Sequence, residues 1–256
     1  MKGLILFLFC LGLPAMAQDV LVIGEVHDNP AHHQEQAARI SELKPAAVVF
    51  EMLTADQAAV VSPEVLGNPK LLETKLDWVH SGWPDFDMYY PVFAATNGAA
   101  IYGAGLDRGD ARAAMSGGFD EPMQGEADKY GLNGPLPPEQ QSEREALQMV
   151  AHCNALPEEM LPGMVQVQRL RDAMLARAVV EAKAATGGPV VLITGNGHAR
   201  RDWGVPAILA NVAPDLDVRV VGQTEDDNDL RGDFDEVISA PAVEREDPCA
   251  VFSKDS

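Results

Sequence analysis

Two short apolar runs separated by one helical segment constrain the fold of this chain most strongly. Val20–Ile23 and residues 46–50 are apolar throughout, as strands are when a sheet is covered on both faces. The segment between them opens near Pro30, carries apolar residues at helical spacing and stops at Pro45. A strand, a helix and a second strand in this order predict parallel pairing with a right-handed crossover.

The remainder of the chain continues this pattern around a long helical stretch. Further strands are expected at residues 100–103, 189–193 and 218–221, with an edge strand at 237–239. Helices are expected at residues 68–80, 85–97 and 205–211, and the longest at 164–185. Glycine and proline pairs between residues 108 and 183 mark loops between helices. We therefore expect one α/β domain over residues 18–256, with a mostly parallel central sheet, helices on both faces, and a helical insertion or cap at about 108–185.

The first 17 residues have the features of a secretory signal peptide. Lys2 precedes an apolar run, and Ala15-Met16-Ala17 supplies a cleavage site with small residues at the required positions. We expect cleavage near Ala17 and a periplasmic or secreted protein. No other apolar run is long enough for a membrane helix, so we expect no membrane span in the mature chain.

Cysteine content and charge narrow the possible environments and partners. Cleavage would remove Cys10 and leave Cys153 and Cys249, an even pair that we expect to form a disulfide after export. Two unrelated free thiols are the alternative. The chain has 39 acidic and 19 basic residues, a net charge of -20, which argues against nucleic acid as a partner.

Polar residues follow three of the expected strands. Gly24-Glu25-Val26-His27 follows the first strand, Glu51 the second, and Gly195-Asn196-Gly197-His198 the strand at 189–193. Ligands of open α/β sheets bind outside the carboxyl ends of the strands, so we expect these groups to form one site. Each glycine is expected to let the chain turn sharply and point its histidine back across the sheet.

These residue types suit either metal binding or proton transfer. Two imidazoles with one or two carboxylates, here His27, His198, Glu25 and Glu51, form a ligand set for a divalent metal such as Mn, Co or Zn. The same four groups are candidates for acid–base catalysis without a metal. The alternative is that they only cap helices and satisfy loop amides.

Residues 23–33, with the sequence IGEVHDNPAHH, resemble the opening signature of the ChaN-like haem-binding uptake family of the Tiki superfamily. Residues 49–52, 83–91, 171–172 and 195–200 are similar to later blocks of that family, so the resemblance extends over about residues 20–221. It implies haem binding linked to bacterial iron uptake. The wider superfamily also contains metal-dependent proteases and erythromycin-esterase-like hydrolases with paired Gly-x-x-His motifs and glutamates. The chain has no lipoprotein motif at Cys10, so membrane tethering is not implied.

Haem binding in an exported uptake protein implies an anionic tyrosine on ferric iron and cations near the propionates. Tyr89 and Tyr90 are the candidate iron ligands, and the choice between them stays open. Packing of their helix on the sheet is the alternative for both aromatic rings.

The resemblance also points to side chains for the propionates. His32 and His33, at the start of the first helix, could face the pocket mouth and bond propionates or donate a ligand, or they could be solvated. Arg108 and Arg200, each just beyond a strand, are better propionate partners because guanidinium pairs bidentately with carboxylate. Either arginine could instead pair with an acidic side chain.

The favoured function is therefore an exported protein that binds haem or an iron complex for uptake. The alternative is a metal-dependent hydrolase in which Glu25 or Glu51 is the general base, and His27 and His198 bind the metal or stabilise an oxyanion. Arg171-Asp172 is expected to be a buried or interface pair on the long helix, and it could orient Glu25 or His198. The chain has no Gly-x-Ser-x-Gly elbow for a serine nucleophile. Protein partners considered are a second copy of the chain and a component of an uptake system.

Overall fold

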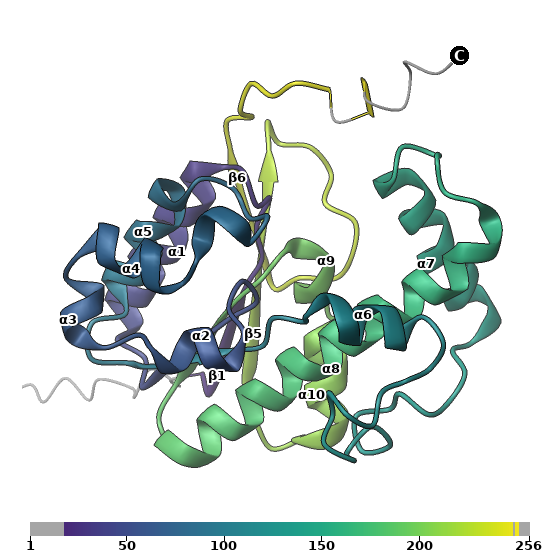
Figure 1. Cartoon of the computed structure of the whole chain (residues 1–256), viewed down its shortest axis with the longest axis horizontal. Helices are drawn as coiled ribbons and strands as arrows, with labels where there is room; N and C mark the ends of the chain where they lie inside the picture. The colour runs from purple at the N-terminus through teal and green to yellow at the C-terminus, as the bar shows by residue number, and fades with distance from the viewer. Residues whose placement is uncertain (1–17, 248, 251–256) are drawn as a thin grey trace, which may run out of the picture.

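A computed structural model describes residues 18–247 and 249–250, and the expected signal peptide lies outside this part of the chain. Within it, six strands form one sheet in which every neighbouring pair is parallel, in the order β3-β2-β4-β1-β5-β6 (Figure 1). The strands are β1 (Val20–Ile23), β2 (Ala47–Phe50), β3 (Ala100–Gly103), β4 (Val190–Ile193), β5 (Val218–Glu225) and β6 (Glu236–Ala240).

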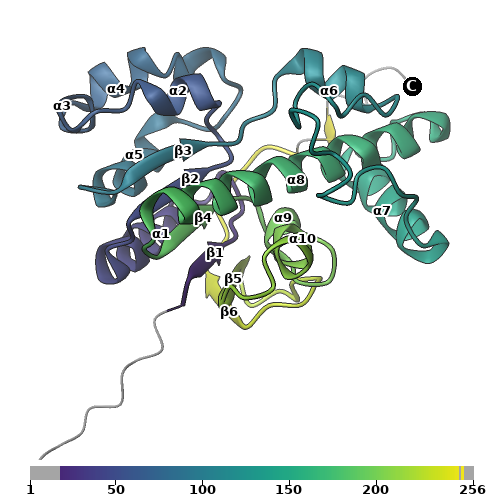
Figure 2. The ribbon, with the colours of Figure 1, turned by 90° about the horizontal axis from the view of Figure 1, so that it is seen from below.

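Helices cover both faces of this sheet. They are α1 (Pro30–Leu43), α2 (Ala55–Ala59), α3 (Pro63–Leu66), α4 (Pro69–Lys75), α5 (Phe86–Ala95), α6 (Arg108–Ala114), α7 (Pro138–Ala151), α8 (Leu161–Thr186), α9 (Asn196–Ala199) and α10 (Val205–Val212), with 3-10 turns η1 (Trp78–His80) and η2 (Glu158–Met160). Figure 2 shows α1 and α5 on one side of the sheet, and α8 and α10 on the other. The predicted fold class is confirmed.

The apolar strands form this sheet because both of their faces are buried. Val20 and Val22 of β1 belong to the core cluster under α8, whereas Leu21 and Ile23 belong to the cluster under α1 and α5. All four side chains are at most 2% exposed. Alternate residues of one strand therefore fill two separate cores, as a parallel sheet between two helical layers requires.

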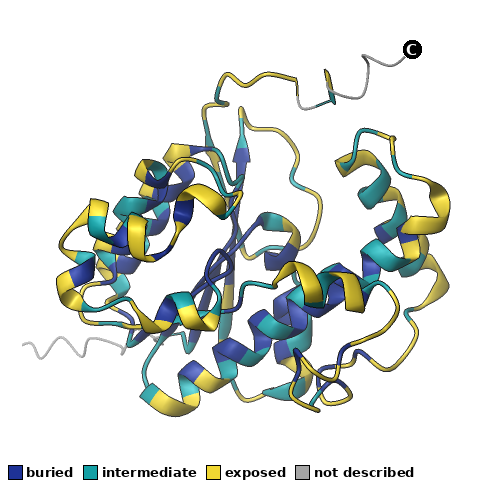
Figure 3. Cartoon of the chain, in the orientation of Figure 1, coloured by how far each residue is buried: buried dark blue, intermediate teal, exposed yellow. Residues whose placement is uncertain are grey.

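The helical segment between β3 and β4 contains α6, α7 and α8. The long α8 packs directly on β2, β3 and β4, so it is a layer of the sandwich, and α7 packs on its outer side. The α8 helix begins three residues before the expected start, because Pro162 is tolerated in a first turn, and it ends at the left-handed Gly187. Figure 3 shows the buried side of α8 along the sheet.

Two elements differ from the sequence prediction. The helix expected at residues 68–80 is divided into α4 and η1, because Asp77 adopts a left-handed conformation with φ 49. The strand expected at 218–221 continues to Glu225, since its last five residues pair with the edge strand β6. The edge strand itself is confirmed.

The C-terminal segment crosses back to the first strand end and to α7. The Arg245 guanidinium donates to both carboxylate oxygens of Asp28 and to Glu225, and Cys249 forms the expected disulfide with Cys153 beyond the end of α7. The prediction of this disulfide is confirmed. No helix in residues 18–247 and 249–250 has both the length and the apolar character that a membrane span requires.

Candidate functional site

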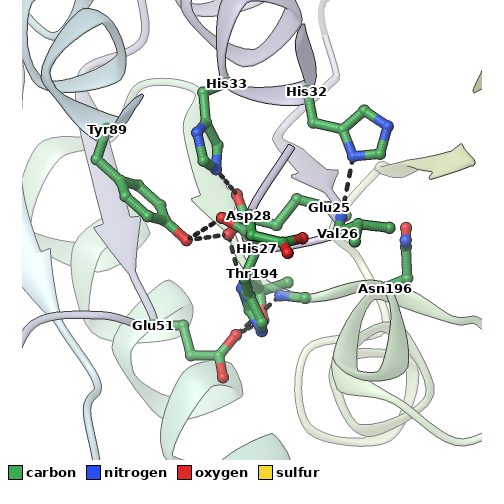
Figure 4. A network of polar contacts seen from close by, with 12 residues as sticks. Glu25, Val26, His27, Asp28, His32, His33, Glu51, Tyr89, Thr194 and Asn196 are labelled. Atoms are coloured by element: carbon green, nitrogen blue, oxygen red, sulfur yellow. Dashed lines mark hydrogen bonds and ion pairs between the residues drawn. The ribbon is translucent and has the colours of Figure 1, made fainter. Parts of the chain in front are cut away.

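The polar strand ends meet at the carboxyl edge of the sheet. Glu25, Glu51 and Thr194 follow β1, β2 and β4, which are neighbours in the sheet order. His27 lies in the loop after β1, and His198 lies on the short helix α9 after β4. Figure 4 shows most of these side chains gathered around Glu25 and Glu51. The structure thus brings together the four residues that the sequence selected as one site.

The two Gly-x-x-His motifs pack against each other through their glycines. A Cβ at Gly195 would lie 2.9 Å from the Cε1 and Nε2 atoms of His27, and a Cβ at Gly24 would overlap Asn196. Gly195 has an extended backbone, and neither glycine has a positive φ. Neither position therefore needs glycine for a left-handed conformation. Both positions need glycine because a side chain on the first glycine of either motif would overlap a residue of the other motif.

Glu25 is the centre of a buried hydrogen-bond cluster. Its Oε1 accepts from His27 Nδ1 at 2.7 Å and from the Tyr89 hydroxyl at 2.6 Å, and its Oε2 accepts from Gln36 Nε2 at 2.6 Å. His33 Nε2 lies 3.5 Å from Oε2. Burial alone would raise the pKa of Glu25, but the contacts with His27 and His33 lower it to about 2. Glu25 is therefore an ionised group that orients His27, and both of its oxygens are engaged.

His27 keeps one ring nitrogen available. Its Nδ1 is held by Glu25, its ring meets Trp83 edge-on at 4.8 Å, and its side chain is 38% exposed. Burial lowers the pKa of His27, but the hydrogen bond to Glu25 and the charge of Glu51 outweigh it and raise the pKa. With Nδ1 held by Glu25, Nε2 is the ring nitrogen left to exchange a proton with a ligand.

A second imidazole–carboxylate pair lies beside the first. His198 Nδ1 is 2.6 Å from Asp172 Oδ1, and its Nε2 is 3.6 Å from Glu51 Oε1. Burial lowers the pKa of His198, while the charges of Glu51 and Asp172 raise it, with a net increase. The expected role of the Arg171-Asp172 dipeptide as a support for the site agrees with these contacts. Arg144 of α7 adds a longer ion pair, with its NH1 atom 3.7 Å from Asp172 Oδ2.

Glu51 has one saturated and one available oxygen. Oε2 accepts from the Thr194 hydroxyl at 2.7 Å and from the Gly195 amide at 2.8 Å. Oε1 has only the His198 contact and Arg171 NH1 at 3.8 Å. Burial would raise the pKa of Glu51, but the nearby imidazole charges and these hydrogen bonds lower it. A carboxylate fixed in this way presents Oε1 to a ligand, a water molecule or a cation.

The geometry does not favour the two tyrosines as iron ligands. Tyr89 is fully buried, its hydroxyl donates to Glu25, and burial together with the Glu25 charge raises its pKa, which opposes tyrosinate formation. Tyr90 is half-buried, and its hydroxyl donates to the Leu66 carbonyl at 3.2 Å. The Tyr89 ring contacts His33 and Trp78, and the Tyr90 ring contacts Phe86. These contacts agree with the alternative prediction, in which both rings have a packing role.

The two histidines of α1 are also inside the protein. Neither His32 nor His33 has any exposed surface, so the expected position at a pocket mouth was wrong. His32 accepts from the Val26 amide at 3.0 Å, and its other nitrogen contacts the Thr224 carbonyl at 3.2 Å. Burial lowers the pKa of His32, so a neutral ring bridges β1 and β5. His33 stacks on Tyr89 with the ring centroids 4.0 Å apart.

The two predicted propionate partners lie in different pockets. Arg200 lines a pocket of about 370 Å³ between α7, α8, α9 and the loop after β5, which we name the cap pocket. Its guanidinium is already held by Asp202 at 2.6 Å and stacks on Trp203 at 3.4 Å. Arg108 lines a pocket of about 470 Å³ beside Glu51, which we name the strand-end cleft. The two pockets share no lining residue.

Sequence reasoning missed several residues that complete the site. Gln36, Thr194 and Arg144 each contact one of its carboxylates. Gln36 follows His32 and His33 by about one helical turn on the buried face of α1, and polar residues at that spacing on an otherwise buried face were the available signal. No sequence signal identified Arg144, because the insertion brings it to the site from α7.

The described side chains do not form a ready metal cage. In residues 18–247 and 249–250, no group of three or more His, Cys, Asp and Glu side chains is arranged to hold a metal ion. Glu25 is the least suited of the four expected ligands because its oxygens already accept hydrogen bonds. The metal set His27, His198, Glu25 and Glu51 stays a prediction.

Comparison with known proteins places this geometry in a family. A solved structure of ChaN of Campylobacter jejuni, described as binding cofacial haem, matches 84% of this chain and 85% of its own with a TM-score of 0.61 at 20% identity, which supports the shared fold. A type III effector matches 87% of this chain and 88% of its own with a TM-score of 0.45 at 15% identity. An erythromycin esterase matches 82% and 71% with a TM-score of 0.43 at 13% identity.

No curated protein sequence matches the chain. A family model described as haem-binding uptake, Tiki superfamily, ChaN matches residues 14–209, most of the sequence. The chain therefore belongs to the ChaN haem-binding uptake family of the Tiki superfamily.

Proposed function

We propose that this protein binds haem or a related iron complex and acts in iron or haem uptake after export. Membership of the ChaN family supports the ligand class. The single observation that carries the proposal is the cap pocket, which combines apolar walls with arginines and one carboxylate-supported imidazole. This is the chemistry that a flat, apolar ligand with two carboxylates needs.

The walls of the cap pocket are apolar on three sides. Leu147 and Val150 come from α7, Val165 from α8, and Leu230 from the loop after β5. Val150 is 66% exposed, which is unusual for an apolar side chain beside a pocket. A porphyrin ring would cover these side chains and remove them from water, and a second copy of the chain or an uptake partner could close the open side.

The polar rim of this pocket suits carboxylates. Arg231 is exposed and has no hydrogen bond or ion pair to any described residue. Arg144 is nine-tenths buried, but its Nε is without a partner and its single hydrogen bond goes to the Trp203 carbonyl at 3.1 Å. These two guanidinium groups have unused N–H groups that would donate hydrogen bonds to propionates, whereas Arg200 already donates to Asp202.

His198 is the imidazole that lines the pocket and would hold the iron. Asp172 fixes its Nδ1 and makes the ring more basic, so Nε2, which lies 3.6 Å from Glu51 Oε1, is the nitrogen left to coordinate iron. Bound haem would supply the iron that the uptake system carries. Because the pKa of His198 is raised, its proton competes with a ligand, and haem affinity should increase with pH.

Export is the other part of the proposal. The sequence of residues 1–17 and the disulfide between Cys153 and Cys249 both support an oxidising compartment outside the cytoplasm. Periplasmic extraction of the expressed full-length chain, followed by mass determination, would test it. A protein beginning near Gln18 in the periplasm is expected.

The test of haem binding is a titration with ferric haem followed by its Soret absorbance. Val150→Glu places a carboxylate at the exposed rim and should weaken binding at least tenfold, because haem is anionic. Val79→Glu is the matched control, since Val79 is 77% exposed on η1 and far from the pocket residues. His198→Ala should shift the Soret band, and Tyr89→Phe should leave it unchanged. Equal affinities for the two glutamate variants would refute the cap pocket as the haem site.

A second candidate function is hydrolysis at the same strand ends. His198 Nε2 lies 3.6 Å from the available oxygen of Glu51, and the charge of Glu51 contributes to the raised pKa values of both His27 and His198. Glu51 would hold a water molecule and accept its proton, and the protonated imidazoles would stabilise an oxyanion. A divalent metal, if one binds, would supply Lewis acidity. Glu51→Gln should abolish turnover of an activated ester such as p-nitrophenyl acetate while haem binding persists.

A further inference from the structure

Two arginines in the strand-end cleft have no hydrogen-bond acceptor, although the chain is strongly acidic. With 39 acidic residues to 19 basic ones, acceptors are abundant. Five arginines elsewhere donate hydrogen bonds to carboxylates within the protein, namely Arg39, Arg200, Arg201, Arg219 and Arg245. Arg108 and Arg171 make none among the described residues. Exposed arginines such as Arg108 commonly lack a partner, but the buried, unpartnered Nε of Arg171 requires an explanation.

Arg171 is the more constrained of the two. It lies on α8, its Nε is buried without a partner, and its side chain is 29% exposed. Its NH1 atom is 3.8 Å from Glu51 Oε1, which is too long for a hydrogen bond. If Arg171 served only to pair with Glu51, its NH1 atom would be expected within hydrogen-bond distance of Oε1. A buried N–H group without an acceptor costs free energy. The geometry instead leaves the planar edge of the guanidinium available to another acceptor.

The cleft around these arginines has the shape of a small-ligand site. It has a volume of about 470 Å³ and extends from Glu51 and Arg171 to Arg108, the first residue of α6. Trp83 also lines the cleft, and its ring contacts His27. Met52 and Leu106 add apolar surface. The lining thus combines two arginines and the carboxylates of Glu51 and Asp107 with aromatic and aliphatic side chains.

We propose that the strand-end cleft binds an organic carboxylate with an aromatic or apolar body. The ligand carboxylate accepts two hydrogen bonds from Arg171 and gains the charge of Arg108, and its body packs on Trp83. This site is separate from the haem site proposed in the cap pocket, because the two share no lining residue. It brings the ligand next to Glu51 and His27, the groups with available polar atoms.

The test compares phenylacetate with phenylacetamide, which has the same shape and no charge. Binding to the purified protein is followed by ¹H–¹⁵N NMR, with the Trp83 indole signal as the reporter. Phenylacetate is expected to bind saturably, and phenylacetamide at least tenfold more weakly. Arg171→Gln should weaken phenylacetate at least tenfold. Arg108→Gln should weaken phenylacetate binding by about threefold or more. Because Arg108 is exposed, this substitution removes no buried contact and should leave folding unchanged.

Arg112→Gln is the matched control. Arg112 is an exposed arginine on α6, four residues from Arg108 and outside the cleft lining, so its replacement should leave affinity within twofold. Equal binding of the acid and the amide, or unchanged affinity in the Arg171 and Arg108 variants, would overturn the proposal. Displacement of phenylacetate by haem would also overturn it, since the arginines would then serve haem propionates. If the protein binds phenylacetate but does not bind haem, the proposed haem site in the cap pocket is refuted and the carboxylate site is still supported.

Discussion

Replacing Gly195 with alanine is the sharpest test of how the two Gly-x-x-His motifs depend on each other. The new Cβ would lie 2.9 Å from both Cε1 and Nε2 of His27, closer than carbon atoms approach without displacement. The neighbouring strand ends surround it, and Glu51 Oε2 would be 3.8 Å away. Either His27 must leave its position, or the β4–α9 connection must move.

The cost of each route in folding free energy can be estimated. If His27 swings out, the hydrogen bond from its Nδ1 to the buried Glu25 is lost, and bonds to charged groups contribute about 1.5–3 kcal/mol. The lower part of that range applies because the His27 side chain is 38% exposed. If the backbone moves instead, the extra methyl is an overpacking change, which costs about 1–3 kcal/mol. Both routes predict a loss of about 1–3 kcal/mol, or roughly 2–12 °C in Tm for a chain of this size.

Urea denaturation and a histidine NMR titration together measure the outcome. Gly195→Ala should be less stable, and the pKa of His27 should fall towards its ordinary value as Glu25 loses contact with it. Gly197→Ala is the matched control, because a Cβ there meets nothing within 4 Å and α9 is helical at this position. That variant should be neutral or slightly more stable. If Gly195→Ala retains both the stability and the His27 titration of the parent, the interlocking of the motifs is refuted.

Three further predictions concern the supports of the site. Asp172→Asn should lower the pKa of His198, as measured by NMR. Because folding raises that pKa, the His198–Asp172 pair stabilises the protein fully below about pH 6.5, and this contribution is lost as the pH rises through the folded pKa. The free energy of unfolding of the variant should therefore depend less on pH. Reduction of Cys153–Cys249, which are 96 residues apart, should cost about 2–5 kcal/mol in urea melts, and Cys153→Ser should be insensitive to reductant. Tyr89→Phe removes a donor to a buried carboxylate and should cost about 1.5–3 kcal/mol by the same assay, while unchanged stability would contradict the role assigned to its hydroxyl.

The fold was predictable because its strands are simple in sequence. Each of the runs at 20–23, 47–50 and 190–193 is apolar at every position, and the structure buries all of these side chains. The polar residue after each run marks the carboxyl edge of the sheet. Parallel strands place these edges together, so the proximity of Glu25, Glu51 and His198 followed from topology before any coordinates were known.

The roles of single side chains were less predictable, because they depend on what lies across the fold. Tyr89 and Tyr90 are adjacent in sequence, yet one reaches Glu25 and the other the Leu66 carbonyl, since neighbouring helical residues point about 100° apart. The exposure of His32 could not be read from its position at a helix start, because β5 covers that end of α1. Contacts of this kind are fixed by tertiary packing and leave no local pattern.

The charged groups of the site form one network between the two pockets. Three buried carboxylates, Glu25, Glu51 and Asp172, lie beside two imidazoles, and the carboxylate charges contribute to the raised pKa values of His27 and His198. Many inner atoms of this network bond to each other, whereas Glu51 Oε1 and the two Nε2 atoms of His27 and His198 make no hydrogen bond to a described residue. Substitutions in the lining of either pocket should therefore change which ligand binds there and leave these hydrogen bonds intact. Glu51 contacts Arg171 of the strand-end cleft and His198 of the cap pocket, so a charged ligand in either pocket should shift the titration of the same carboxylate.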